Sequence, residues 1–172
     1  MTEWTTIIDQ YGQLVWATVW RLLGNSADAL DCYQETFLEA VKVARREPVN
    51  NWGALLRHLA TARALDLLRA RCRQQNRTDA MVGPDTLVSQ EADPRQEAEA
   101  NELAERLRVA LAQLPGDQAE VFCLSCLDKL SYREIAERLN LTINAVGVLL
   151  HRARQRLREL LIPVDAGSTK GD

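Results

Sequence analysis

The chain has 172 residues, of which 47% are hydrophobic and 26% charged, a balance typical of one ordinary globular domain or two small ones. Aromatic residues make up only 5%, while Ala, Leu, Arg and Glu dominate, and this composition favours helices over a sheet. No apolar run approaches the roughly 20 residues that a membrane-spanning helix needs, and the first residues do not resemble a secretory signal. We therefore expect an all-α cytoplasmic protein without membrane insertion.

Charge is segregated along the chain, although the net charge is only −3. Residues 51–77 carry six arginines and one acidic residue, residues 78–120 carry three arginines and ten acidic residues, and residues 121–162 carry seven basic and four acidic residues. Two basic regions separated by an acidic one suit two contacts with a polyanion such as nucleic acid. Charge alone fits a pair of solvated helix ends equally well.

Hydrophobic spacing predicts three helices in the first half of the chain, over residues 4–23, 26–46 and 52–73. Their predicted buried side chains are Ile8, Tyr11, Val15, Val19 and Leu22 in the first, Leu30, Tyr33, Phe37 and Val41 in the second, and Trp52, Leu56, Leu59, Ala60 and Leu67 in the third. Gly24 is expected to end the first helix, because glycine tolerates the left-handed backbone conformation. Ser26 is expected to cap the second helix.

A segment without helical or strand periodicity separates two structured parts. The predicted organisation is a domain at 1–76, an acidic flexible linker at 77–92, a second domain at 93–162 and a disordered tail at 163–172. Asp93 and Pro94 have the order of a helix cap followed by a first-turn proline, and they predict where the second domain begins. Helices are expected there up to residue 114 and again over 117–127.

The most specific local signal lies in residues 131–161. Ser131 and Glu134 have the spacing of a capping box, in which each side chain accepts a hydrogen bond from the other residue's backbone N–H. The short helix that they begin is expected to end at Asn140, and Thr142 is expected to cap a last helix. Helix, tight turn and helix is the arrangement of helix-turn-helix DNA-binding motifs, with an ordinary helical hairpin as the alternative.

Side chains suited to catalysis or metal binding do not form a motif. Cys123 and Cys126 have the C-x-x-C spacing, but no second Cys or His pair lies near them, so we interpret them as apolar residues on one helix face. His58 and His151 fall in different predicted domains, without a nucleophile or paired carboxylate at motif spacing. The sequence therefore predicts neither an enzyme nor a bound metal or cofactor.

Three stretches together resemble the extracytoplasmic-function (ECF) sigma factors, which are bacterial specificity subunits of RNA polymerase. They are Asp31-Cys-Tyr-Gln-Glu-Thr-Phe37, residues 59–69 with the alternate arginines that follow, and residues 114–154 around Leu130-Ser-Tyr-Arg-Glu-Ile-Ala136. The resemblance covers nearly the whole chain outside the linker and tail. It implies two helical domains that bind core RNA polymerase and promoter DNA to start transcription. It also implies a cognate anti-sigma factor that holds the protein inactive.

The resemblance assigns three sets of contact residues. The set expected on the clamp of the polymerase beta-prime subunit is Asp31, Gln34, Glu35 and Leu38. The set expected on the melted minus-ten strand is Asn50, Asn51, Arg57, His58, Thr61, Arg69, Arg71 and Arg73. The set expected on the minus-thirty-five element is Tyr132, Arg133, Thr142, Asn144, Ala145, Val148, His151, Arg152 and Arg154. The second domain is also expected to meet the polymerase beta flap.

Two of these sets have a simpler interpretation from the residues alone. The acidic face at Asp31 could be a solvated surface, and the arginines from Arg69 onward favour the negative end of a helix dipole wherever they occur. The resemblance also implies that the side of the third helix around Arg57, His58 and Thr61 is exposed. Arg63 and Asp66, three positions apart, are interpreted as a structural ion pair.

The chain departs from the family in its last helix, where Gly147, Val148 and Leu149 stand in place of basic residues and serine. Ala62 likewise replaces an asparagine. Little capacity for paired hydrogen bonds to base edges remains beyond Asn144. Two other functions therefore stay open: a helix-turn-helix regulator that binds duplex DNA without polymerase, and a polymerase-binding adaptor without promoter choice. Whether the two domains pack together in the free protein is a question for the tertiary structure.

Overall fold

The computed structural model describes residues 3–77 and 94–162, and all the regular structure within them is helical. The elements are α1 (Trp4–Leu23), α2 (Ser26–Arg46), α3 (Trp52–Gln75), α4 (Pro94–Gln113), α5 (Gly116–Phe122), the π-helical turn η1 (Cys123–Leu127), α6 (Tyr132–Leu139) and α7 (Ile143–Leu161). The predicted all-α class is confirmed. The expected tail, and the expected linker beyond residue 77, lie outside the described residues. Within the described ranges, no helix is both long and apolar enough to cross a membrane.

Local capping residues mark the end of α1 and the start of α2. Gly24 has φ 68°, and its N–H donates to the Trp20 carbonyl at 2.9 Å, so the predicted end of α1 is confirmed. The prediction that Ser26 caps α2 is wrong. Asn25 is the cap, because its side-chain oxygen accepts from the Asp28 N–H at 2.9 Å while Ser26 already lies inside the helix.

The helix-turn-helix prediction is confirmed in detail. The Ser131 hydroxyl accepts from the Glu134 N–H at 3.2 Å, and the Glu134 carboxylate accepts from the Ser131 N–H at 2.9 Å. Asn140 has φ 54° and ends α6 in the left-handed conformation. Thr142 caps α7 by accepting from the Ala145 N–H at 3.1 Å. An eight-residue helix is too short to be stable alone, so these caps matter for α6.

The N-terminal half, α1–α3, buries narrower helix faces than the hydrophobic spacing predicts. Val15, Val19 and Leu22 are buried as expected, but Ile8 is 42% exposed and Leu30 is 49% exposed. The buried side of α2 consists mainly of smaller residues: Ala29, Cys32, Thr36, Phe37 and Ala40. Ile8 and Leu30 therefore lie outside the buried faces of their helices.

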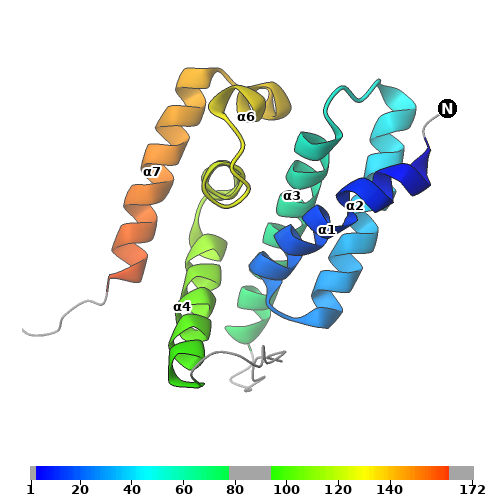
Figure 1. Cartoon of the computed structure of the whole chain (residues 1–172). Helices are drawn as coiled ribbons and strands as arrows, with labels where there is room; N and C mark the ends of the chain where they lie inside the picture. The colour runs from blue at the N-terminus through cyan, green and yellow to red at the C-terminus, as the bar shows by residue number, and fades with distance from the viewer. Residues whose placement is uncertain (1–2, 78–93, 163–172) are drawn as a thin grey trace, which may run out of the picture.

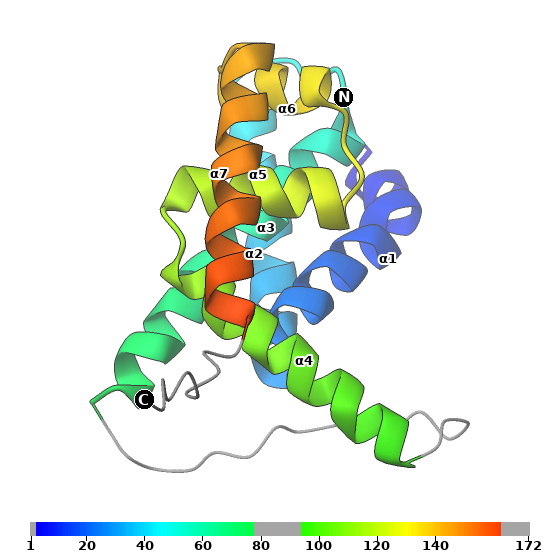
Figure 2. The same ribbon diagram turned by 90° about the vertical axis from the view of Figure 1, so that its left-hand side faces the viewer.

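The C-terminal half, α4–α7, packs directly on the N-terminal half (Figure 1). Helix α3 lies between the two halves and contacts α4, α5, η1 and α6. One hydrophobic core contains residues of both halves, among them Leu65 and Leu68 of α3 with Leu111 and Leu114 near the end of α4. In the second view α7 lies on the outer side of the molecule, with α5 and α3 behind it (Figure 2). The two halves therefore form one closed body in the free chain.

The expected helix over 117–127 is divided into α5 and the π-helical turn η1. The Asp128 N–H donates to the carbonyl of Cys123, five residues back, and the Leu130 N–H donates to the Leu124 carbonyl. Lys129 then adopts a positive φ of 60°. This widened turn ends the helix and directs Asp128 toward the N-terminal half.

Candidate polymerase and nucleic-acid interfaces

The face of α2 expected to meet the polymerase is exposed. All four of its residues are exposed, namely Asp31, Gln34, Glu35 and Leu38, and Leu38 is 62% exposed. Glu35 and Leu38 line a groove between α2 and α3. A polar cluster beside an exposed leucine is the composition of a reversible protein interface.

The predicted ion pair between Arg63 and Asp66 is wrong. Arg63 instead pairs with Glu35 across the groove, and Asp66 pairs with Arg69 at 3.5 Å on its own helix. The groove between α2 and α3 offers Arg63 a carboxylate on the neighbouring helix, which the spacing within one helix does not reveal. The α2–α3 groove is therefore bordered by paired charges and open on its outer side.

The loop expected to handle the minus-ten strand faces the C-terminal half. Asn50 and Asn51 are exposed, and the Asn51 side chain accepts from the Ala54 N–H at 2.9 Å as the cap of α3. A polar pocket separates this loop from α6. Its lining residues are Glu47, Pro48, Asn50, Asn51, Ala54, Glu134, Glu137 and Arg138. Carboxylates from both halves thus surround the two asparagines.

The expectation that the side of α3 around His58 and Thr61 is exposed is wrong. Thr61 is 0% exposed, and its hydroxyl donates to the Asp128 carboxylate at 3.1 Å. Nε2 of His58 lies 2.9 Å from a Glu120 oxygen, and Arg57 is half-buried. Helix α5 and η1 cover this side of α3. A covering element distant in sequence leaves no local signal, which is why helical spacing alone missed the burial.

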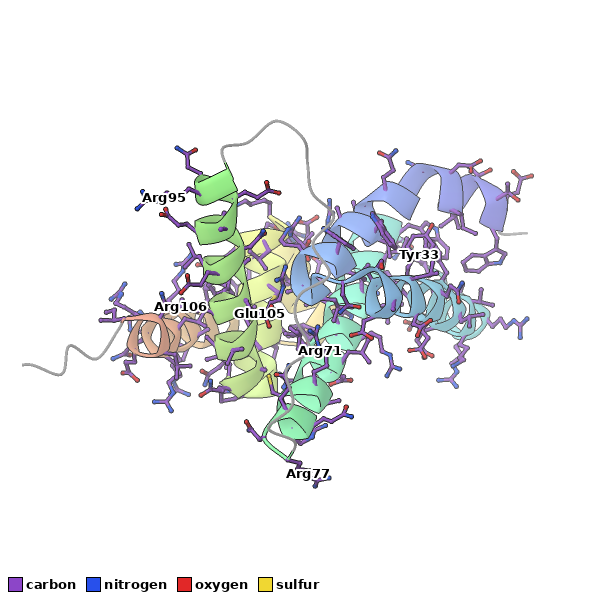
Figure 3. All side chains as sticks on the ribbon, turned by 90° about the horizontal axis from the view of Figure 1, so that it is seen from below. Tyr33, Arg71, Arg77, Arg95, Glu105 and Arg106 are labelled. Carbon is purple, nitrogen blue, oxygen red and sulfur yellow. The ribbon has the colours of Figure 1, made fainter. Side chains whose placement is uncertain are left out.

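The arginines near the end of α3 also differ in their surroundings. Arg69 pairs with Asp66 and lies beside Gly116 at the start of α5. Arg71 donates to the Leu23 carbonyl at 2.9 Å and so connects α3 to the end of α1. Figure 3 shows Arg71 toward the lower end of α3. In this form Arg69 and Arg71 bind groups of the protein, while Arg73 is exposed.

A buried carboxylate that the sequence did not single out lies between the halves. The Asp128 side chain is only 3% exposed. Its Oδ1 accepts from the Thr18 hydroxyl at 2.9 Å and lies 3.4 Å from the Arg21 guanidinium, and its Oδ2 accepts from Thr61. Thr18 and Arg21 belong to α1 and Thr61 to α3, so all three donors come from the opposite half. No local sequence signal marks this residue, because its partners are 67 or more positions away.

The helix-turn-helix exposes eight of the nine residues in the predicted minus-thirty-five set. Within the set, the exposed residues are Tyr132, Arg133, Thr142, Asn144, Val148, His151, Arg152 and Arg154. The Thr142 hydroxyl is occupied as the cap of α7, and Ala145 is half-buried. Ile143, which was not predicted, is 57% exposed beside Asn144. The start of α7 therefore presents apolar side chains and one carboxamide, and basic residues follow along the helix.

Comparison with known proteins assigns these two halves to one family. Residues 7–74 match the family model described as sigma-70 region 2, and residues 104–157 match the model described as sigma-70, region 4. The chain is 31% identical over 149 residues to the RNA polymerase sigma factor CarQ of Myxococcus xanthus, covering 82% of this chain and 79% of that protein. The chain belongs to the ECF sigma factors of the sigma-70 family.

Two further relatives carry the ECF description. The ECF RNA polymerase sigma factor SigE of Mycolicibacterium smegmatis is 30% identical over 162 residues, covering 94% of this sigma factor but only 62% of that protein. The ECF RNA polymerase sigma factor SigW of Bacillus subtilis is 29% identical over 162 residues, covering 90% of this sigma factor and 87% of that protein. This sigma factor therefore spans about three fifths of the length of SigE and most of the length of SigW.

Solved structures show the same fold. The sigma factor RpoE from Bartonella quintana, crystallised with the anti-sigma factor NepR, aligns with a TM-score of 0.57 at 22% identity, covering 94% of this chain and 98% of that one. The ECF sigma factor SigJ of Mycobacterium tuberculosis aligns with a TM-score of 0.54 at 24% identity, covering 89% of this chain and 52% of that one. The region 2 match contains most of α1 and all of α2, and the region 4 match contains α5 and α6.

Burial disfavours the thiolate form of two core cysteines, Cys32 and Cys123. Burial raises the pKa of the Cys32 thiol to about 12, and it also raises the pKa of the fully buried Cys123 thiol. Cys126, the second member of the C-x-x-C pair, is half-buried and accepts from Arg154 at 3.6 Å. Metal binding and redox chemistry use thiolates, so these surroundings favour the interpretation of Cys123 as an apolar core residue.

Proposed function

We propose that this ECF sigma factor docks on the polymerase beta-prime clamp through the exposed face of α2 and directs initiation at a two-element promoter. The observation that carries the proposal is the exposure of Gln34, Glu35 and Leu38 beside an open groove. These residues lie on the element that the family resemblance assigns to the clamp. A surface that is solvated in the free protein can bind a partner without prior rearrangement.

The minus-ten element would be bound by the N-terminal half, once its covered side is free. Asn50 offers a carboxamide for hydrogen bonds to base edges, and Asn51, whose oxygen caps α3, offers its amide NH2 group. A flipped or single-stranded base needs such groups. Arg73 is exposed in the closed form and available to phosphate. Arg57 and His58 join this surface only when α5 and η1 move away.

The minus-thirty-five element would be bound by α7 in the major groove. Asn144 can pair with an adenine edge, while the exposed Ile143 and Val148 suit contact with thymine methyl groups. Arg152 and Arg154 lie further along the helix and suit phosphates. We therefore propose that the reading surface prefers A·T pairs at its centre and obtains much of its affinity from the DNA backbone.

Regulation by an anti-sigma factor is part of the proposal. The sigma factor in one similar structure is crystallised with the anti-sigma factor NepR. A partner of this class would act on the present chain by holding its halves together or by covering the α2 face. The proposed activity is binding rather than catalysis, and it takes place where the polymerase works, in the cytoplasm.

Run-off transcription tests the proposal. Fragmented genomic DNA of the source organism is transcribed by its core polymerase with and without the protein. Discrete transcripts that appear only with the protein would establish promoter choice. Binding to core without new transcripts would favour the adaptor, and DNA binding without core binding would favour the stand-alone regulator.

A further inference from the structure

We propose that Asp128 is an intramolecular latch that keeps the two halves closed until the polymerase is bound. The closed halves cover the proposed minus-ten surface, which contains Asn50, Asn51, Arg57, His58 and Thr61. The inference rests on the proposed function only for the identity of the covered surface. Closure itself is a property of the free chain. Its test therefore does not depend on transcription.

The latch is built from one acceptor group and three donors. The Asp128 carboxylate comes from the C-terminal half, and the Thr18 hydroxyl, the Thr61 hydroxyl and the Arg21 guanidinium come from the N-terminal half. Thr18 is 2% exposed and Thr61 is 0% exposed. A carboxylate this deeply buried is stable only while such donors satisfy its oxygens. The carboxylate adds directional polar contacts to the apolar core that the two halves share.

The backbone of the C-terminal half holds Asp128 at this position. In the π-helical turn the Asp128 N–H donates a hydrogen bond to the Cys123 carbonyl, with an N···O distance of 3.0 Å. Lys129 follows with φ 60°. Cys123 and Leu124 beside it are fully buried. π-Helical turns occur often at functional positions because they interrupt the regular helix and redirect one side chain. Here the redirected side chain is the one that joins the halves.

Closure blocks nucleic acid in two ways. First, α5 and η1 cover Thr61 and half-bury His58, whose Nε2 lies 2.9 Å from Glu120. Second, Glu134 and Glu137 of α6 line the pocket beside Asn50. Arg138 lines the same pocket, but it is outnumbered by Glu47, Glu134 and Glu137, so the net negative charge there opposes a phosphate backbone that approaches the loop.

The α2 face stays accessible while the minus-ten surface is covered. Gln34, Glu35 and Leu38 are exposed in the closed form, and none of them belongs to the latch. Polymerase can therefore dock before the halves separate. When they do separate, water can solvate Asp128 and its donors, so the polar part of the interface allows reversible opening. The result is a sigma factor whose free form excludes DNA and whose bound form admits it.

The latch is tested by X-ray scattering from the full chain in solution. The double variant Thr18→Val/Thr61→Val keeps side-chain shape but removes both hydroxyl donors, and Asp128→Ala removes the acceptor. A compact chain of this length has a radius of gyration of about 16 Å, and we expect both variants to exceed the wild-type value by several ångström. Each lost hydrogen bond to a buried carboxylate shifts the closed–open equilibrium by about tenfold or more.

Thr36→Val is the matched control. Thr36 is 1% exposed in the same half, and its hydroxyl donates to the Cys32 carbonyl of its own helix at 2.7 Å. This variant loses one buried hydrogen bond without touching the contact between the halves, so its radius should equal that of wild type. If Asp128→Ala fails to fold, as judged by circular dichroism, the radius of gyration of the double threonine variant alone tests the latch. A folded double variant with the wild-type radius would overturn the latch.

A second measurement separates failure of the latch from failure of the proposed function. Binding of a fluorescent single-stranded oligonucleotide of random sequence is compared between wild type and the double variant, without polymerase. Tighter binding by an expanded variant supports both the latch and the covered minus-ten surface. An expanded variant without tighter binding supports the latch and contradicts the assignment of this surface to DNA. An unexpanded variant contradicts the latch, whatever it binds.

Discussion

Replacing Gln34 and Glu35 together with alanine should weaken polymerase binding about 10- to 100-fold and leave the fold intact. Both side chains are exposed on α2. The only ion pair lost within the described part of the chain is Glu35 with Arg63, whose side chains are 46% and 43% exposed. Exposed pairs of this kind contribute about 0.2 to 1 kcal/mol to stability. Alanine also has a higher helix propensity than either residue, which offsets part of this loss.

The expected loss of binding is larger than the expected loss of stability. A minority of interface side chains cost more than about 1 kcal/mol each when truncated to alanine, and we expect Gln34 and Glu35 to be among them. Two neighbouring truncations therefore weaken the complex by about 2 kcal/mol, and every 1.4 kcal/mol corresponds to a tenfold change in Kd. A stability loss below about 1 kcal/mol lowers Tm by no more than roughly 4 °C in a chain of this size.

The assay is titration of fluorescently labelled sigma factor with core polymerase, alongside thermal unfolding followed by circular dichroism. Glu99→Ala is the matched control, because Glu99 is an exposed glutamate in an i,i+4 pair with Arg95 and lies outside both family matches. The control should bind like wild type. Unchanged affinity of the Gln34/Glu35 variant would remove the α2 face from the mechanism, and equal weakening in Glu99→Ala would show that the effect is general.

Three other predictions concern individual residues. Ser131→Ala should destabilise the protein by about 1 kcal/mol in thermal unfolding, because α6 loses its cap. The Ser131 backbone N–H, which this substitution keeps, donates to Glu134 and lowers the pKa of that carboxyl group. The stability that this hydrogen bond contributes is complete above the usual carboxyl pKa and is lost as the pH falls through the lowered value. Gly147→Ala should stabilise the protein by up to about 1 kcal/mol in the same assay, because the added Cβ would lie 3.8 Å from Tyr132, an ordinary contact distance. Arg73→Ala should lower the salt slope of promoter-complex affinity by about one unit in binding titrations.

Each of these predictions can be contradicted directly. A Ser131→Ala protein with unchanged stability at neutral pH would show that α6 does not depend on its cap. Destabilisation by Gly147→Ala would mean that the start of α7 needs the flexibility of glycine. A salt slope that does not change in Arg73→Ala would leave this arginine as a helix-end residue.

The order of residue types along the chain was enough to predict the helices, most of their ends and the family. Gly24, Asn140 and the Ser131–Glu134 capping box act within a few residues of their own positions, so their effect is visible in the local order of residue types. The exposed face of α2 was also predictable, because Asp31, Gln34, Glu35 and Leu38 share one side of the helix. Ser26 shows the limit of this reasoning even locally, because the adjacent Asn25 competes for the same role and takes it.

What covers the proposed minus-ten surface depends on tertiary packing, which helical spacing does not report. Thr61 is hidden because α5 and η1 pack on α3, and its partner Asp128 lies 67 positions away. The choice of Glu35 as the partner of Arg63 likewise depends on the distance between two helices. Burial and pairing are properties of surfaces brought together from distant parts of the chain, whereas helical spacing reports only which residues share a face. For this reason the helices could be predicted from local residue patterns, whereas the closed arrangement of the two halves could not.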